Sequence, residues 1–180
     1  MKTFIRVLLA VAIFNLGHGI VRADGGYSFD FTLAQKKTGG DKKETRDMTK
    51  FKENWAYVVT MVNTSFKDVA NIEVKYIIFI KPEKPGRDST GNVKYQRHEG
   101  STTTPLLKNN DQFVFTTDSV ELSGVELADG WVWASGANTR SKDKLRGLWI
   151  RVFVSGVQVA EFMDPPELST KETWDAAPAQ

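Results

Sequence analysis

The sequence predicts an all-β protein, an antiparallel sandwich of two sheets with about seven to nine strands. Three observations support this prediction. Apolar and polar residues alternate over many short runs, Gly, Pro, Asn and Asp cluster between the runs, and no apolar pattern of helical period extends beyond one or two turns. Many short strands joined by turn residues, without crossover helices, are typical of sandwiches and barrels, and we favour the sandwich.

The two strongest strand patterns lie between residues 55 and 81. Residues 55–62 alternate between two faces, and residues 72–80 carry Ile, Val and Tyr on one parity. A strand points successive side chains to opposite faces, so a period of two indicates one buried face. Residues 77–79 are apolar on both parities, and we expect this part to be covered on both sides. The polar residues 63–71 predict a connecting loop.

The remaining expected strands are shorter. Residues 155–156 (Ser-Gly) form a two-residue turn between the last two strands, which predicts a hairpin. For residues 120–127, a strand and a strand that ends in one helical turn capped by Ser123 are alternatives. In chain order these strands cover residues 27–33, 93–99 continuing extended over 102–108, 112–117, 120–127, 130–135, 148–154 and 157–162.

Polar segments rich in turn residues are predicted as loops. Residues 36–50 contain two glycines and charges of both signs, which favours a solvated loop over a binding arm. Residues 82–92 and 136–146 are interpreted as surface loops. Residues 164–180 are interpreted as a flexible C-terminal tail.

The first 23 residues have the three-part pattern of a secretory signal peptide. Lys2 and Arg6 precede an apolar run over residues 7–16, and Val21 and Ala23 are small residues at positions −3 and −1 of a cut after Ala23. The alternative is an uncleaved anchor, but a bilayer span needs roughly 20 apolar residues. We therefore expect residues 1–23 to be removed, residues 24–163 to form the sandwich domain, and the protein to be periplasmic or secreted, without a transmembrane segment after cleavage.

Cleavage changes the charge of the chain. The 24 basic residues lose three with the signal peptide, which leaves 21 against 22 acidic residues and a formal charge of −1. A nucleic-acid partner is therefore not expected. Cysteine is absent, which is compatible with an exported domain long enough to be stable without disulfides.

One stretch resembles a known class of module. The pattern V-x-x-x-N-x-S over residues 59–65, followed by V-A-N-I-E-V-K-Y over residues 69–76, resembles the B–C region of secreted immunoglobulin-like and fibronectin III-like modules. The late hairpin with V-S-G-V resembles their final two strands. The resemblance covers residues 27–162 and implies an immunoglobulin-like sandwich. The Cys…Trp…Cys frame of antibody domains is absent, so only the architecture carries over.

The chain offers few residues for catalysis or metal binding. The mature chain has one histidine, His98, within a polar run, and no nucleophile motif. A zinc site needs several nitrogen or sulfur ligands. We expect no catalytic residues, no metal and no cofactor. A hydrolase stays an alternative because acids lie close in sequence in two groups: Glu121, Glu126 and Asp129, and Glu161 and Asp164.

Two tryptophans are the first candidates for binding. Trp131 and Trp133 are two residues apart and share a face if residues 130–135 form a strand. Two indoles side by side could bind sugar rings, as in a carbohydrate-binding module. The alternative is that both rings fill the core between the sheets.

A run of alternating basic residues is the second candidate. Arg140, Lys142, Lys144 and Arg146 could contact an acidic polymer or a protein partner, and a solvated loop is the alternative. Together these observations predict an exported, non-catalytic binding or accessory module of the cell envelope, with a carbohydrate-binding module and a hydrolase as alternatives. The partner is expected to be a protein or a polysaccharide of the envelope.

Overall fold

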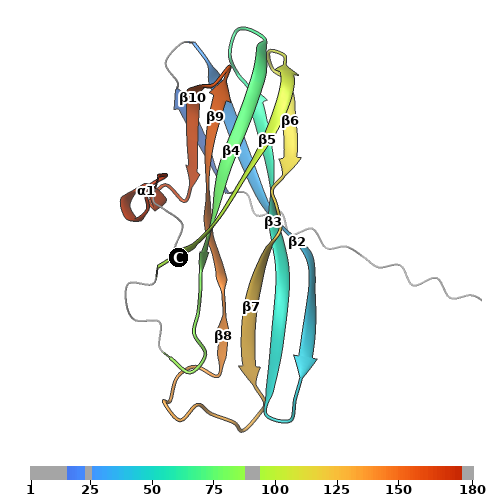
Figure 1. The fold of residues 1–180 in the computed structure, drawn as a ribbon, viewed down its shortest axis with the longest axis vertical. Coiled ribbons are helices and arrows are strands. Elements are labelled where there is room, and N and C mark those ends of the chain that lie inside the picture. The colour runs from blue at the N-terminus through green and yellow to red at the C-terminus, as the bar shows by residue number, and fades with distance from the viewer. Residues whose placement is uncertain (1–15, 23–25, 88–93, 176–180) are drawn as a thin grey trace, which may run out of the picture.

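The computed structural model describes residues 16–22, 26–87 and 94–175, and all statements on the structure refer to them. They form ten strands in two antiparallel sheets and one short helix (Figure 1). Nine strands lie beyond residue 23, so the predicted all-β, two-sheet fold is confirmed. The elements are β1 (Leu16–Arg22), β2 (Ser28–Glu44), β3 (Met48–Asn63), β4 (Val69–Lys81), β5 (Gln96–Leu107), β6 (Gln112–Thr116), β7 (Val120–Leu127), β8 (Arg140–Lys142), β9 (Lys144–Val154), β10 (Val157–Asp164) and α1 (Leu168–Lys171).

The first sheet is built around β3. Its order is β1-β2-β3-β7-β8, and β6 also pairs with β3. One edge of β3 pairs with β2, while the other pairs with β7 over residues 48–55 and with β6 over residues 58–62. Thus β6 and β7 lie end to end along β3. The Tyr57 amide donates to Thr117 Oγ1 at the junction, over 2.9 Å.

The second sheet has the order β10-β9-β4-β5. The predicted hairpin around residues 155–156 is confirmed, since β9 and β10 pair antiparallel across it. The two strongest strand patterns, β3 and β4, belong to different sheets. The loop between them therefore carries the chain from one sheet to the other.

Asn63 organises this crossing. Its side chain is buried, and Nδ2 lies 2.9, 3.0 and 3.1 Å from the carbonyl oxygens of Lys67, Leu107 and Lys108. Its Oδ1 accepts the amide of Ser65 at 3.0 Å. One side-chain amide thus provides hydrogen-bond partners for backbone groups of two loops, one before β4 and one after β5.

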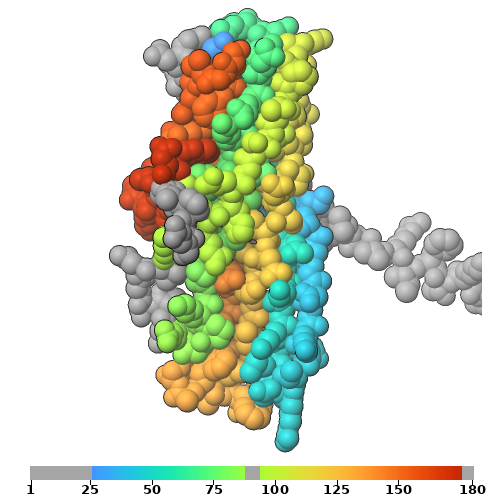
Figure 2. Space-filling model, in the orientation of Figure 1, coloured from blue at the N-terminus to red at the C-terminus, as the bar shows by residue number. Residues whose placement is uncertain are grey.

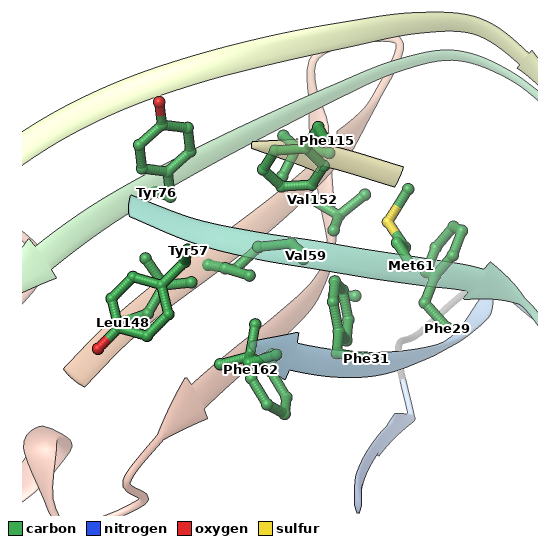
Figure 3. Packing of buried hydrophobic residues seen from close by; sticks show 14 of the residues in the cluster. Phe29, Phe31, Tyr57, Val59, Met61, Tyr76, Phe115, Leu148, Val152 and Phe162 are labelled. Atoms are coloured by element: carbon green, nitrogen blue, oxygen red, sulfur yellow. The ribbon is translucent and has the colours of Figure 1, made fainter. Parts of the chain in front are cut away.

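The main core lies between the two sheets. Phe31 of β2 stacks on Phe162 of β10 with ring centroids 5.0 Å apart, and Tyr57, Val59 and Met61 of β3 are buried beside them (Figure 3). A second, smaller cluster covers the outer face of the four-stranded sheet. It contains Ile77, Phe79, Trp149 and Leu168. The expectation that residues 77–79 are covered on both sides is therefore confirmed.

Residues 165–175 form the outer part of this second cluster. Leu168 of α1 is buried, and the indoles of Trp174 and Trp149 meet edge to face with centroids 5.7 Å apart. The Arg97 guanidinium donates to the carbonyl oxygens of Thr173 and Trp174. A tail without fixed contacts was expected here, whereas the structure shows this segment packed on the sheet. Residues 176–180 lie outside the described residues.

The prediction of a loop over residues 36–50 is wrong. Strand β2 continues to Glu44 and β3 begins at Met48, so these residues form the end of a long hairpin. Side chains on both faces of this hairpin are largely solvent-exposed, so the sequence shows no alternation of apolar and polar residues there. The register shifts at residues 37–39, beside Gly40, whose φ is +155°.

The extended run expected over residues 93–99 and 102–108 corresponds to β5, which runs unbroken from Gln96 to Leu107. Three further expectations need correction. The loop expected over residues 136–146 contains β8 and the start of β9. The helical turn considered near Ser123 is a continuation of strand β7. Residues 130–135 are a loop, not a strand. No helix among the described residues is long and apolar enough to cross a membrane.

β1 lies within the residues predicted to be a signal peptide. It pairs antiparallel with β2 over residues 28–33. The rest of the predicted signal peptide lies outside the described residues. Cleavage after Ala23 stays a prediction.

Candidate functional site

One end of the molecule extends beyond the main core. Every second residue of β3 points to the same face of the sheet. On the face directed to the core these residues are, from the main core outwards, Met61, Val59, Tyr57, Trp55, Glu53 and Phe51. The first three are buried, whereas Trp55, Glu53 and Phe51 are only partly buried. We call the part of the first sheet built from residues 36–55, with β7 and β8, the arm. It lies in the lower half of Figure 1, and its hairpin projects as the tip in Figure 2.

A cavity of about 330 Å³ lies on the arm. We call it the arm groove. It is lined by Lys37, Gly40, Asp41, Lys42, Phe51, Lys52, Glu53, Glu126 and Arg140.

Phe51 supplies the apolar surface of the groove. Its ring packs directly against the backbone of Gly124 on β7, where a Cβ atom would lie 2.3 Å from the ring. The Arg140 guanidinium lies 5.8 Å from the ring centroid, within the range of a cation–π contact. Arg140 Nε is also 3.8 Å from Glu126 Oε2. The groove therefore places a planar cation beside an aromatic ring.

Glu53 is the acidic residue that binds two of the lysines at the groove. Its carboxylate accepts hydrogen bonds from Lys142 Nζ, from Lys37 Nζ at 2.8 Å and from Trp55 Nε1 at 3.0 Å. The bond from Lys142, followed by that from Lys37, lowers the pKa of Glu53 from 4.5 to about 2. Glu53 is therefore ionised at neutral pH and holds two ammonium groups at fixed positions. Lys142 Nζ also lies 5.6 Å from the centroid of the Trp55 ring.

The four predicted basic residues separate into two pairs. Arg140 lines the groove and Lys142 binds Glu53 beside it, both from β8. Lys144 pairs instead with Glu83 at 2.5 Å, and Arg146 Nε donates to Tyr95 Oη at 3.2 Å. The structure thus brings Arg140 and Lys142 together and directs Lys144 and Arg146 to other partners.

Trp131 and Trp133 lie in the loop between β7 and β8. Trp131 is 50% exposed, whereas Trp133 is partly buried and packs on Gly86. The Nε1 atom of Trp133 is buried and has no hydrogen-bond partner among the described residues. The expected common strand face does not form, so the geometry that suggested a flat sugar platform is not present.

Three of the five acids that lie close in sequence form ion pairs. Glu121 pairs with Lys52 at 2.9 Å, Glu126 with Arg140, and Glu161 accepts from Arg151 Nε at 2.6 Å. No group of three or more His, Asp or Glu side chains that could hold a metal ion occurs within the described part of the chain. Charge at the groove is thus used for pairing between side chains.

Four residues of the groove were not among the predicted site residues: Lys37, Lys42, Phe51 and Glu53. The first two lie in the segment predicted as a loop, and the other two just beyond it. One sequence signal could have identified Phe51 and Glu53: they continue the alternation of Trp55, Tyr57 and Val59. Extending that alternation backwards leads into the arm.

No protein-family model and no curated protein matches the chain. Solved structures with a similar arrangement include the structural-genomics target SoR45, with 11% identity, a TM-score of 0.37, and 84% of this chain and 92% of that chain covered. An ApaA-like protein from Bordetella pertussis has 14% identity and a TM-score of 0.32, with 75% and 92% covered. A protein from Akkermansia muciniphila has 10% identity and a TM-score of 0.33, with 88% and 81% covered. At these scores the similarities carry no argument about function.

Proposed function

We propose that this chain is an exported, non-catalytic binding module of the cell envelope, periplasmic or secreted, and that its arm groove binds an acidic polysaccharide. The N-terminal pattern supports export. The observation that carries the proposal is the arm groove, where Phe51 lies among positioned cations.

The length of the exposed β2–β3 hairpin in the arm requires a physical explanation. Fixing the backbone of each residue costs roughly 1–2 kcal/mol, and burial of apolar surface is the main compensation in a folded domain. Residues 35–44 bury almost no apolar side chain, since nearly all of them are exposed. This end of the hairpin adds little to the core, so a role in binding accounts for its length better than a role in stability.

The charges indicate the class of ligand. Lys42 pairs with Glu44, and Arg140 with Glu126, in ion pairs whose members are about half exposed or more. Exposed pairs of this kind contribute about 0–1 kcal/mol, so a ligand carboxylate can replace Glu44 or Glu126 at little cost. Phe51 offers an apolar surface to the C–H face of a sugar ring. A polymer with repeated carboxylates and sugar rings satisfies both features.

Binding to polygalacturonate and to neutral dextran, measured by calorimetry on the exported protein, tests this proposal. We expect binding to polygalacturonate alone, and a loss of affinity of about tenfold or more between low and moderate salt, because the contacts are ionic. Replacing Arg140 and Lys142 by Gln should abolish binding. Lys75→Gln is the matched control, since Lys75 pairs with Glu73 on the other sheet. Equal binding by the double variant and the control would refute the groove as the site.

Export is tested separately. The mass of the exported protein should correspond to a chain that begins at Asp24. A chain that keeps residues 1–23, or that is not exported, would contradict this part of the proposal and leave the binding result unaffected.

A further inference from the structure

The edge of β2 that faces away from β3 carries β1. The two strands pair antiparallel, with Val21 opposite Phe29, Ile20 opposite Asp30 and Gly19 opposite Phe31. β1 also contacts β10, the edge strand of the second sheet. It therefore fills a slot one strand wide between the two sheets, at the upper end of Figure 1.

The strands that flank this slot are tied together by the core. Phe31 of β2 stacks on Phe162 of β10, and both rings are buried (Figure 3). Phe29, on the same face of β2, is also buried. The slot thus runs along the edge of an apolar core that is closed by a single strand.

Cleavage after Ala23 removes this strand. We propose that the vacated edge of β2, residues 28–33, is a strand-acceptor site that binds one extended segment of a partner protein, antiparallel to β2. The inference rests on the proposed export and names the form of the protein partner. An edge strand with unpaired backbone groups is a template for another strand, and strand addition is an established mode of peptide binding.

The register defines the chemistry of the occupant. Residues opposite Phe29 and Phe31 share their face, which is directed to the core, so the occupant needs small or apolar side chains at these two positions. The position between them, opposite Asp30, lies on the outer face and accepts a polar residue. A second copy of the domain would bring a whole sheet to this edge, where β10 already contacts the strand that pairs with β2. A single extended segment is therefore the expected occupant.

The experiment uses the exported, processed protein and a capped synthetic peptide of residues 16–22 as the probe. Hydrogen exchange of residues 28–33 is measured with and without peptide. At a peptide concentration about ten times Kd, exchange at this edge should slow about tenfold, because the bound strand must leave before these amides open. The same peptide with Val21→Pro is the control. The Ser28 carbonyl accepts from Thr64 on the β3 side, so the backbone groups of the next residue, Phe29, face β1, and proline at Val21, opposite Phe29, removes a donor from the ladder.

Three results would overturn the inference. The first is no effect of the peptide on residues 28–33. The second is equal protection by the peptide with Val21→Pro, which would indicate adsorption without strand pairing. The third is a processed protein whose mass shows that residues 16–22 are retained, because the slot then holds its own strand. Polygalacturonate binding depends on the arm groove, so its failure is distinguishable from each of these.

Discussion

Glu53 shows how one residue sets the charge of the arm groove. Its carboxylate accepts three hydrogen bonds, from Lys142, Lys37 and Trp55. These bonds lower its pKa to about 2, so ionised Glu53 stabilises the folded state above pH 4.5 and loses this contribution as the pH falls towards 2.

We therefore expect Glu53→Gln to lower the stability of the arm at pH 6 by about 1 kcal/mol, a value typical of charged hydrogen bonds that are partly exposed. The difference from wild type should shrink between pH 4.5 and pH 2, because the wild-type carboxylate becomes protonated there. Thermal unfolding of both proteins at a series of pH values measures this difference in stability. Glu44→Gln is the control, since Glu44 is largely exposed and bonds only to Lys42. A difference that does not depend on pH would contradict the assignment of charge to Glu53.

Asn63 is the residue on which the crossing between the sheets depends. Asn63→Ala removes the donor to three carbonyl oxygens and the acceptor for the Ser65 amide. Buried groups that lose a partner cost about 1–3 kcal/mol each, so we expect a loss of about 3 kcal/mol in the free energy of unfolding. Urea denaturation measures it.

Two further variants separate this explanation from a general effect of substitution. Asn138→Ala should cost less than about 1 kcal/mol, because Asn138 is exposed and accepts one hydrogen bond, from the Arg140 amide. Asn63→Asp keeps the acceptor and removes the donors, and should destabilise at least as much as Asn63→Ala. Wild-type stability in Asn63→Asp would show that the carbonyl oxygens do not depend on this amide.

At the scale of the element, Gly40 determines the path of the β2–β3 hairpin. Its φ of +155° is unfavourable for other residues, and a Cβ atom would lie 2.5 Å from the carbonyl oxygen of Lys52. Gly40→Ala should therefore disturb the arm, weaken polygalacturonate binding and increase hydrogen exchange over residues 38–52, with little change in β4 or β9.

The neighbouring glycine provides the control. A Cβ atom at Gly39 would meet only Asn54 Nδ2, at 3.5 Å, an ordinary contact. Gly39→Ala should leave binding and exchange close to wild type. Equal effects of the two substitutions would mean that the conformation of Gly40 does not determine the hairpin.

The elements also show how far the sequence can be interpreted. Strands with one buried face, such as the central part of β3 and the β9–β10 hairpin, were predicted correctly because burial imposes alternation. The end of the β2–β3 hairpin was missed because both of its faces are largely in water. The residues of the candidate site differ in the same way. Arg140 and Lys142 were predicted because they belong to a local pattern of alternating charges. Phe51 and Glu53 acquire their role only because β3 pairs with β2 and β7. Cross-strand neighbours are not visible in the local sequence.

At the scale of the whole molecule, the core is unevenly distributed. The strands β4 and β9 carry long buried runs, while the distal part of β2 carries almost none. Free energies of local opening follow buried apolar contacts, so the molecule should behave as a stable sandwich with a less stable arm.

This difference predicts two levels of hydrogen exchange in the wild-type protein. Amides of residues 38–52 should exchange through local opening, at free energies below that of global unfolding, whereas amides in β4 and β9 should exchange only through global unfolding. Polygalacturonate should raise protection in the arm alone, because it binds the groove and stabilises the closed state by mass action. Exchange at one common free energy would show that the arm unfolds together with the sandwich. In that case the length of β2 and β3 would serve the stability of the domain, and binding would no longer be needed to account for the arm.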